Sequence, residues 1–160
     1  MTLTLFGTKN PPTDLLRSTL LNEDTFYPTF IKDLKRCKSE IIIESPYLTT
    51  RRLSELLPVL EKLKARRVRV LINTRDPRSI TEEYRREDTQ EAASRLQHTG
   101  VHVVFTSNHH RKLVVLDRSI LYEGSLNILS QHCSSEIMRR IESTQLAWQM
   151  ARFVGVDRWL

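Results

Sequence analysis

The sequence is short of the features that mark secreted, membrane-spanning and repetitive proteins. It contains only two cysteines, Cys37 and Cys133, which are too few and too far apart for a disulfide framework. No stretch approaches the roughly 18 consecutive apolar residues of a membrane span, and residues 1–12 lack the basic and apolar regions of a secretion signal. The sequence has neither an internal repeat nor a low-complexity tract. We therefore expect a cytoplasmic protein with reduced thiols and no membrane partner.

Positive charge, by contrast, is in excess. The chain has 25 lysines and arginines against 19 aspartates and glutamates, a net charge of +6, which favours a polyanionic partner such as nucleic acid. Many basic residues come in doublets, and acidic neighbours neutralise the doublet at 85–86. The doublets at 51–52, 111–112 and 139–140 lack such neighbours and are better candidates for phosphate contact. The arginines that we predict to contact nucleic acid are Arg51, Arg52 and Arg111.

Hydrophobic periodicity predicts alternating strands and helices. The expected strands are 41–43, 67–72, 101–105, 113–116, 120–122 and 135–141. The expected helices are 27–38, with Pro28 placing the start near Tyr27, then 51–65, 81–98 and 145–154. This order favours an α/β fold with a mixed sheet sandwiched between helices. We expect a single domain over 1–160, with an irregular N-terminal segment over 1–20.

One pattern in the second half of the chain carries side chains suited to phosphodiester chemistry. Its members have fixed offsets: His110, Lys112 and Asp117 at His-x-Lys-x-x-x-x-Asp spacing, followed by Gly124, Ser125 and Asn127. Alternate side chains of a strand share a face, so His110 and Lys112 should point the same way. Lys112 can supply charge, and Ser125 and Asn127 can supply hydrogen bonds, where negative charge concentrates in the transition state. Asp117 lies at an odd offset, so we expect it to orient or pair with a basic group.

The histidine of this pattern is the candidate nucleophile, because a neutral imidazole can attack phosphorus. A second acid must protonate the departing oxygen, and one His110 cannot easily attack and donate from opposite sides in the same step. No other histidine of the chain is followed two residues later by a lysine. The chemistry therefore requires a second chain in a two-fold arrangement. We expect a homodimer in which each subunit contributes its His110.

Residues 110–127 resemble the signature of the phospholipase D superfamily, which is this His-x-Lys-x-x-x-x-Asp pattern with a trailing Gly-Ser-x-Asn. The single motif and the short chain are most similar to the small bacterial endonucleases of that superfamily, which work as homodimers. The resemblance implies a phospholipase D-like mixed sheet between helices. It also implies that the enzyme needs no cofactor and no metal.

The resemblance further implies a role for each matching side chain. His110 would form a phosphohistidine, and His110 of the partner subunit would act as general acid and then as base. The residues that would bind the phosphate are Lys112, Ser125 and Asn127. Asp117 would support the site. A glutamate downstream of the Gly-Ser element would hold the histidine ring, and Glu136 is the candidate for that role.

Other interpretations of single residues are possible. Histidines 102, 109, 110 and 132 with Cys133 could suggest a metal site, but their spacing matches no zinc signature. The carboxylates at 44, 76 and 117 are too scattered in sequence for a two-metal nuclease. Tyr47, which follows Ser45 and Pro46, could stack on a base or pack at the edge of the core.

The function that we predict is a metal-independent phosphodiesterase, an endonuclease acting on DNA or RNA through a composite site at a homodimer interface. One alternative is a hydrolase of phospholipid headgroups. Lipid enzymes of this superfamily usually carry two motifs and an apolar entry surface, and the chain shows neither. Another alternative is a nucleic-acid-binding module of a larger nuclease or helicase system.

Overall fold

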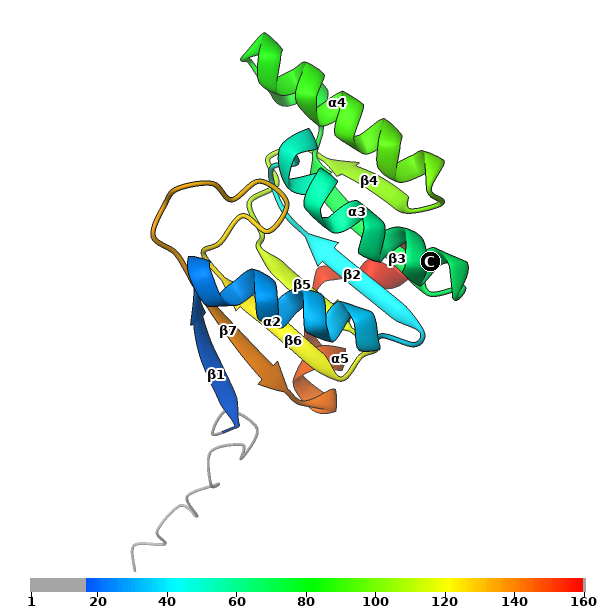
Figure 1. Cartoon of the computed structure of the whole chain (residues 1–160), viewed down its shortest axis with the longest axis vertical. Helices are drawn as coiled ribbons and strands as arrows, with labels where there is room; N and C mark the ends of the chain where they lie inside the picture. The colour runs from blue at the N-terminus through cyan, green and yellow to red at the C-terminus, as the bar shows by residue number, and fades with distance from the viewer. Residues whose placement is uncertain (1–16, 160) are drawn as a thin grey trace, which may run out of the picture.

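Seven strands form one mixed sheet in the computed structural model, which describes residues 17–159 (Figure 1). The strands are β1 Ser18–Asn22, β2 Glu40–Glu44, β3 Arg69–Arg75, β4 His102–Thr106, β5 Leu113–Leu116, β6 Ile120–Gly124 and β7 Ile137–Glu142. Their order across the sheet is β1-β7-β6-β5-β2-β3-β4. β2, β3 and β4 are parallel to one another, and every other neighbouring pair is antiparallel. The predicted α/β fold with a mixed sheet is confirmed.

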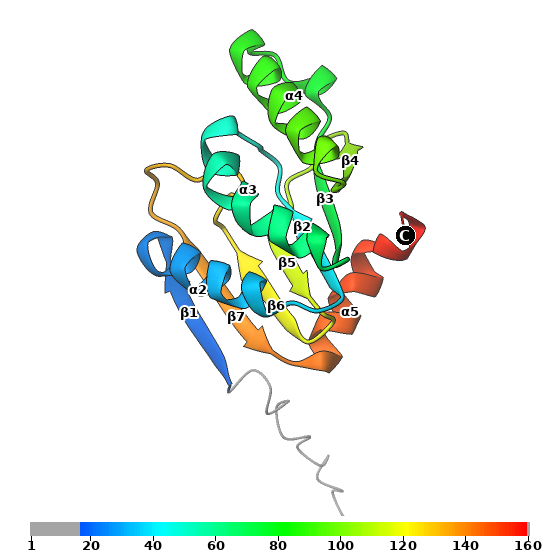
Figure 2. The same cartoon turned by 45° about the vertical axis from the view of Figure 1, so that its right-hand side comes forward.

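Helices cover both faces of this sheet. They are α2 Glu23–Arg36, α3 Thr50–Ala65, α4 Glu83–His98 and α5 Thr144–Val154, with short 3-10 turns at Pro77–Ser79 and Val156–Arg158. α2 and α3 pack on one face, and α5 lies on the other (Figure 2). α4 contacts α3 and β4. None of the helices within residues 17–159 is both long and apolar enough to cross a membrane.

The alternation of side chains along β2 divides the apolar core between the two faces. Ile41 and Ile43 point into the larger cluster under α2 and α3, and Ile42 points into the smaller cluster under α5. All three side chains are fully buried. A strand buried on both faces reads as a continuous apolar run, which is why this strand was recognisable in the sequence.

The N-terminal part of the chain departs from the prediction at two points. Residues 18–20, expected to be irregular, belong to β1, which pairs with β7 at the edge of the sheet; residues 1–16 lie outside the described part of the chain. α2 begins at Glu23, four residues before Tyr27. The reason is a capping box: Asn22 accepts from the Thr25 N–H, and the Thr25 hydroxyl accepts from the Asn22 N–H. Pro28 is accommodated inside the helix.

The sheet brings several chain segments together at one end. β5 runs antiparallel to β2, so its first residue, Leu113, pairs with Glu44, the last residue of β2. Glu44 also pairs with Asn73 near the end of β3. The chain enters β5 and leaves β2, β3, β4 and β6 at this same end of the sheet. Ligands of α/β sheets commonly bind at the carboxyl ends of the strands. The segments that meet at this end are 44–49, 73–76, 106–112 and 124–127.

Candidate active site

His110 and Lys112 lie in the segment just before β5, at this end of the sheet. His110 is exposed, and Lys112 is partly exposed. The Lys112 ammonium donates to the backbone carbonyl of His110 at 2.8 Å, so the ammonium lies beside the His110 backbone. Both residues therefore lie at the start of β5, although the regular strand begins only at Leu113.

An arginine that the sequence pattern did not include touches the His110 ring. Nη2 of Arg75, the last residue of β3, lies 2.8 Å from Nε2 of His110. A guanidinium can only donate, so Nε2 is the acceptor in this contact and its lone pair points toward Arg75. The same arginine donates from Nη1 to the Tyr47 hydroxyl at 3.3 Å and lies over the Tyr47 ring, 5.1 Å from its centroid. The only feature of the sequence that could have pointed to Arg75 is its position as a cation at the carboxyl end of a buried strand.

Buried polar side chains pack against the segment that carries His110. Glu44 is fully buried and accepts from Asn73 and from Nη1 of Arg111, both at 3.3 Å. Burial raises the pKa of this carboxyl above its ordinary value, and the bonds from Asn73 and Arg111 only partly offset that effect. Nε2 of His109 lies 3.7 Å from Glu44 and has no hydrogen-bond partner among residues 17–159. Glu44 therefore holds Arg111 by a hydrogen bond and lies next to the His109 ring.

The two adjacent histidines have opposite environments. His109 is buried, and burial together with the nearby positive charge of Arg111 lowers its pKa to about 4. His109 is therefore neutral at pH 7 and points away from solvent. His110 is exposed. Only the second histidine of the pair is positioned to meet a substrate.

The Gly-Ser-x-Asn element forms the other wall of the site, where β6 ends. The Ser125 hydroxyl accepts from the Ile137 N–H at 3.1 Å, and the Ser125 N–H donates to the Ile137 carbonyl at 2.9 Å. These bonds lock the loop against β7. The Asn127 carbonyl accepts from the Ser130 and Gln131 N–H groups, whereas its side-chain Oδ1 is buried and finds no partner among residues 17–159. The Asn127 amide is therefore the polar group of this element that remains to be satisfied.

Glu136, the predicted holder of the histidine ring, has other partners in the structure. Its carboxylate accepts from the Ser134 hydroxyl at 2.7 Å, and its N–H donates to the Glu23 carboxylate at 3.0 Å. No contact between Glu136 and His110 occurs within the described residues. The contact to the ring comes from Arg75 instead.

Asp117 lies at the far end of β5, away from His110. Its carboxylate accepts from the N–H groups of Lys38, Ser39 and Glu40 and from the Ser39 hydroxyl, all at 2.8–2.9 Å. Burial raises the pKa of Asp117, but these bonds outweigh it and hold the pKa below its ordinary value. We expected Asp117 to orient or pair with a basic group; its hydrogen bonds among the described residues are to the backbone and the Ser39 hydroxyl between α2 and β2. Its place there does not suit a catalytic role.

The predicted nucleic-acid contacts separate into buried and accessible arginines. Arg52 is only 8% exposed, lies 3.8 Å from the centre of the Tyr27 ring and donates to the Gln131 carbonyl. This burial removes Arg52 from the candidate contacts. Arg51 and Arg111 keep about half of their side chains exposed, although each donates one hydrogen bond within the fold.

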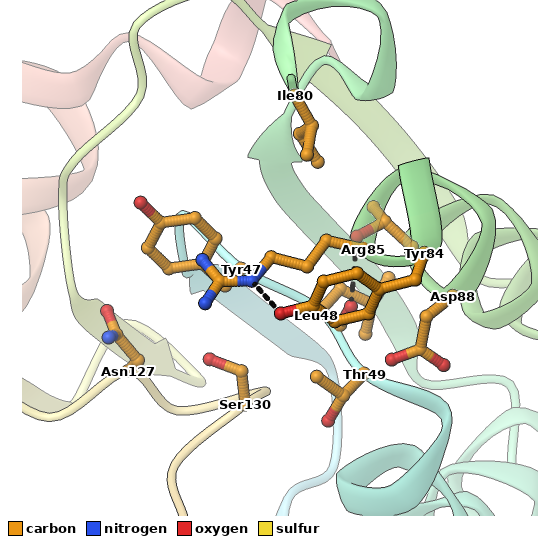
Figure 3. A pocket seen from close by; sticks show the side chains of 10 residues that line it. Tyr47, Leu48, Thr49, Ile80, Tyr84, Arg85, Asp88, Asn127 and Ser130 are labelled. Atoms are coloured by element: carbon orange, nitrogen blue, oxygen red, sulfur yellow. Dashed lines mark hydrogen bonds between the residues drawn. The ribbon is translucent and has the colours of Figure 1, made fainter. Parts of the chain in front are cut away.

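Tyr47 and Asn127 share the wall of a pocket of about 340 Å³ that opens beside this site (Figure 3). Tyr47 comes from the segment after β2, and Asn127 from the loop after β6. Helix α4 supplies the side of the pocket that carries Tyr84 and Arg85. The sequence predicts only a helix over these residues, and nothing in it connects them to residues 110–127.

The acidic residues considered for metals are dispersed. Glu44 faces Arg111, Asp76 is paired with Arg78, and Asp117 binds backbone N–H groups. Across residues 17–159, no three metal-ligating side chains of the His, Cys, Asp and Glu types come together.

Comparisons with known proteins identify the family and agree with the fold. Residues 30–155 match the family model described as cardiolipin synthase, phospholipase D-like domain. The structure is similar to Nuc, a phospholipase D family member from Salmonella typhimurium, with a TM-score of 0.71 and 20% identity over 89% of this chain and 94% of that chain. It is also similar to NucT from Helicobacter pylori, with a TM-score of 0.67 and 12% identity over 86% of this chain and 92% of that chain.

A larger protein contains the same fold as one part. Polyphosphate kinase from Porphyromonas gingivalis aligns with a TM-score of 0.68 and 13% identity, covering 89% of this chain but 26% of that chain. At these identities the likeness establishes the fold. No curated protein sequence gives a significant match.

Proposed function

Because this chain belongs to the phospholipase D-like domain family, we propose that it is a metal-independent phosphodiesterase that cleaves nucleic acid as an endonuclease. The observation that carries the proposal is the exposed His110, whose Nε2 accepts from Arg75 and whose backbone carbonyl accepts from Lys112. Arg75 lies 2.8 Å from that nitrogen, and Lys112 is bonded to the same residue's carbonyl. An imidazole among fixed positive charges suits attack on an anionic phosphodiester.

The proposed reaction has two steps. Nε2 of His110 attacks phosphorus, a phosphorus–nitrogen bond forms, and the bond to the departing oxygen breaks as an acid protonates that oxygen. Water then attacks the phosphohistidine, assisted by the same acid now acting as base, and the bond to Nε2 breaks. Arg75 would move its hydrogen bond from Nε2 to a phosphate oxygen, where Lys112, Ser125 and Asn127 also bind.

The acid in this scheme is His110 of the partner subunit. His109 is unsuited to that role, because it is buried and its pKa is lowered to about 4. Two copies of the site facing each other would supply one nucleophile and one acid for each scissile bond. The contact of Glu136 with the His110 ring, implied by the family resemblance, would have to form in that assembly.

The decisive experiment measures cleavage of labelled DNA and RNA oligonucleotides in excess chelator. Native protein should cut, and His110→Ala should lose at least about 10³-fold in rate. His132→Ala is the matched control, since His132 is an exposed histidine of the loop after β6. Quenched reactions with substrate carrying ³²P at the scissile phosphate should leave label on native protein and none on His110→Ala. Loss of cleavage in chelator would refute the proposal.

A mixing experiment tests the composite site. Native protein titrated with excess His110→Ala should lose activity as mixed dimers form, because each mixed dimer holds a single His110. Solution mass should show a dimer. Full activity of a strictly monomeric protein would overturn the two-histidine scheme.

A further inference from the structure

The pocket beside the candidate active site is built from three separate segments of the chain. Tyr47, Leu48 and Thr49 come from the segment between β2 and α3, Tyr84 and Arg85 from the first turn of α4, and Asn127 and Ser130 from the loop after β6. These side chains line a pocket of about 340 Å³, and Figure 3 shows how they lie around it. That volume is within the range of small-molecule sites.

The walls combine aromatic rings with hydrogen-bonding groups. Tyr84 is 66% exposed, and its hydroxyl accepts from Nε of Arg85 at 2.8 Å. This bond holds the guanidinium and the ring at the same edge of the pocket. Leu48 is fully buried, and its carbonyl accepts from the Thr89 hydroxyl, which ties α4 to this segment. The pocket therefore offers ring faces for stacking and hydroxyl, amide and guanidinium groups for hydrogen bonds.

The pocket is connected to His110 by direct contacts. The Tyr47 hydroxyl accepts from Arg75, and Arg75 touches Nε2 of His110. Asn127, whose buried Oδ1 lacks a partner among residues 17–159, belongs both to the pocket wall and to the predicted phosphate-binding element. A phosphate bound at His110 would therefore place the neighbouring part of its molecule within reach of this pocket.

We propose that the pocket binds one unpaired nucleobase next to the scissile phosphate. This inference rests on the proposed function. A nucleobase presents a flat π-face for Tyr84 and Tyr47 and an edge of donors and acceptors for the polar groups. A base paired inside a duplex cannot enter a pocket, so the site selects single-stranded or extruded nucleotides. An acyl chain would leave the buried Asn127 Oδ1 without a partner.

The test uses full-length protein carrying His110→Ala, so that substrate is bound and not cut. Binding is measured by anisotropy with a labelled single-stranded oligonucleotide. A second oligonucleotide carries abasic residues, and a third is the matching duplex. Adding Tyr84→Ala should weaken binding of the single strand about tenfold and change binding of the abasic and duplex forms little. Tyr84→Phe should retain most of the affinity, because the ring face remains.

The control is Phe153→Ala, which removes an aromatic ring that is 82% exposed on α5, on the other face of the sheet. Both residues are exposed, so neither substitution should unfold the protein. Equal affinities of the Tyr84→Ala and Phe153→Ala proteins for the single strand would overturn the pocket assignment. So would equal losses for intact and abasic strands.

The outcome separates the pocket from the catalytic proposal. If binding depends on the base and on Tyr84 but the protein with its native His110 does not cut, the pocket is supported and the phosphodiesterase function is refuted. Chelator-resistant cleavage that is lost in His110→Ala, together with binding that ignores Tyr84, would support the function and refute the pocket.

Discussion

The two ends of β5 differ sharply, although one short sequence pattern spans both. At the end where β5 begins, His110 is exposed and Lys112 is partly exposed, directed toward the site. At the end where β5 finishes, Asp117 accepts four hydrogen bonds from the segment between α2 and β2. The four strand residues separate these clusters by roughly 13 Å at about 3.3 Å per residue. One end is open for chemistry, and the other is closed by backbone contacts.

The closed end has a structural task that explains its aspartate. Asp117 and Arg118 both adopt positive φ, 49° and 50°, in the turn between β5 and β6, and the Ser119 N–H donates to the Leu116 carbonyl. Such a turn favours asparagine, aspartate or glycine. Arg118 is tied to Glu40 by an ion pair. The spacing between Lys112 and Asp117 therefore corresponds to the length of β5. The candidate site lies at one end of this strand, and the turn to β6 lies at the other.

The comparison predicts that removing Lys112 affects rate and leaves stability unchanged. Lys112→Ala should lower chelator-resistant cleavage by about 10²–10³-fold, because a fixed cation at the phosphate is lost. Its free energy of unfolding should stay within about 0.5 kcal/mol of native. Cleavage rates and urea unfolding measure the two quantities, with Lys62→Ala, an exposed lysine of α3, as control. If the fall in unfolding free energy were large enough to account for the whole loss of cleavage rate, Lys112 would have a structural role at the open end as well.

Gly124 should be the most fragile backbone position near the open end. A Cβ placed there would lie 2.2 Å from the Ile137 carbonyl oxygen and 2.9 Å from Cα of Met138, so β6 and β7 would have to move apart. Gly124→Ala should cost about 3 kcal/mol or more in unfolding free energy and also displace Ser125. Gly100→Ala is the control: its φ is +83° but its near neighbour is the flexible Lys64 side chain at 3.3 Å, and about 1 kcal/mol is expected. Equal losses would refute the steric explanation.

The closed end should show the reverse of Lys112. Asp117→Ala leaves three N–H groups without their acceptor and should lower the free energy of unfolding by about 2–3 kcal/mol. Asp117→Asn, which tolerates the positive φ, should lose about half as much. The cleavage rate of the folded protein should change by less than about threefold, when it is measured under conditions in which the variant is fully folded. A large rate loss in folded Asp117→Asn protein would place the aspartate in the chemistry after all.

The sequence predicted the fold and the open end better than the surroundings of the site. Apolar runs such as Ile41–Ile43 located the strands because burial on both faces leaves a strong signal. Fixed spacing located His110 and Lys112 because they are neighbours along the chain. Arg75 and Tyr84 could not be located, because their places depend on strand register and on where α4 packs. β1 was missed because it is an edge strand with only Leu21 buried.

The buried histidine beside the open end makes stability depend on pH. The pKa of His109 is lowered to about 4, whereas an unfolded histidine takes up its proton near 6.5. The unfolded chain therefore binds more protons between these values, and stability falls as pH decreases from about 6.5 to 4. Glu44, whose pKa is raised by burial, has the opposite effect: its contribution is full below about 4.5 and is lost as pH rises.

Replacing His109 should flatten this dependence. From pH 7 to pH 4.5 native protein should lose about 2 kcal/mol more unfolding free energy than His109→Asn, as measured by urea unfolding at both pH values. His98→Asn, at an exposed histidine that ends α4, should keep the native slope. Parallel slopes for native and His109→Asn protein would mean that His109 takes up its proton in the folded state as easily as in the unfolded one. The contrast between His109 and the exposed His110, on which the choice of nucleophile depends, would then lose its electrostatic basis.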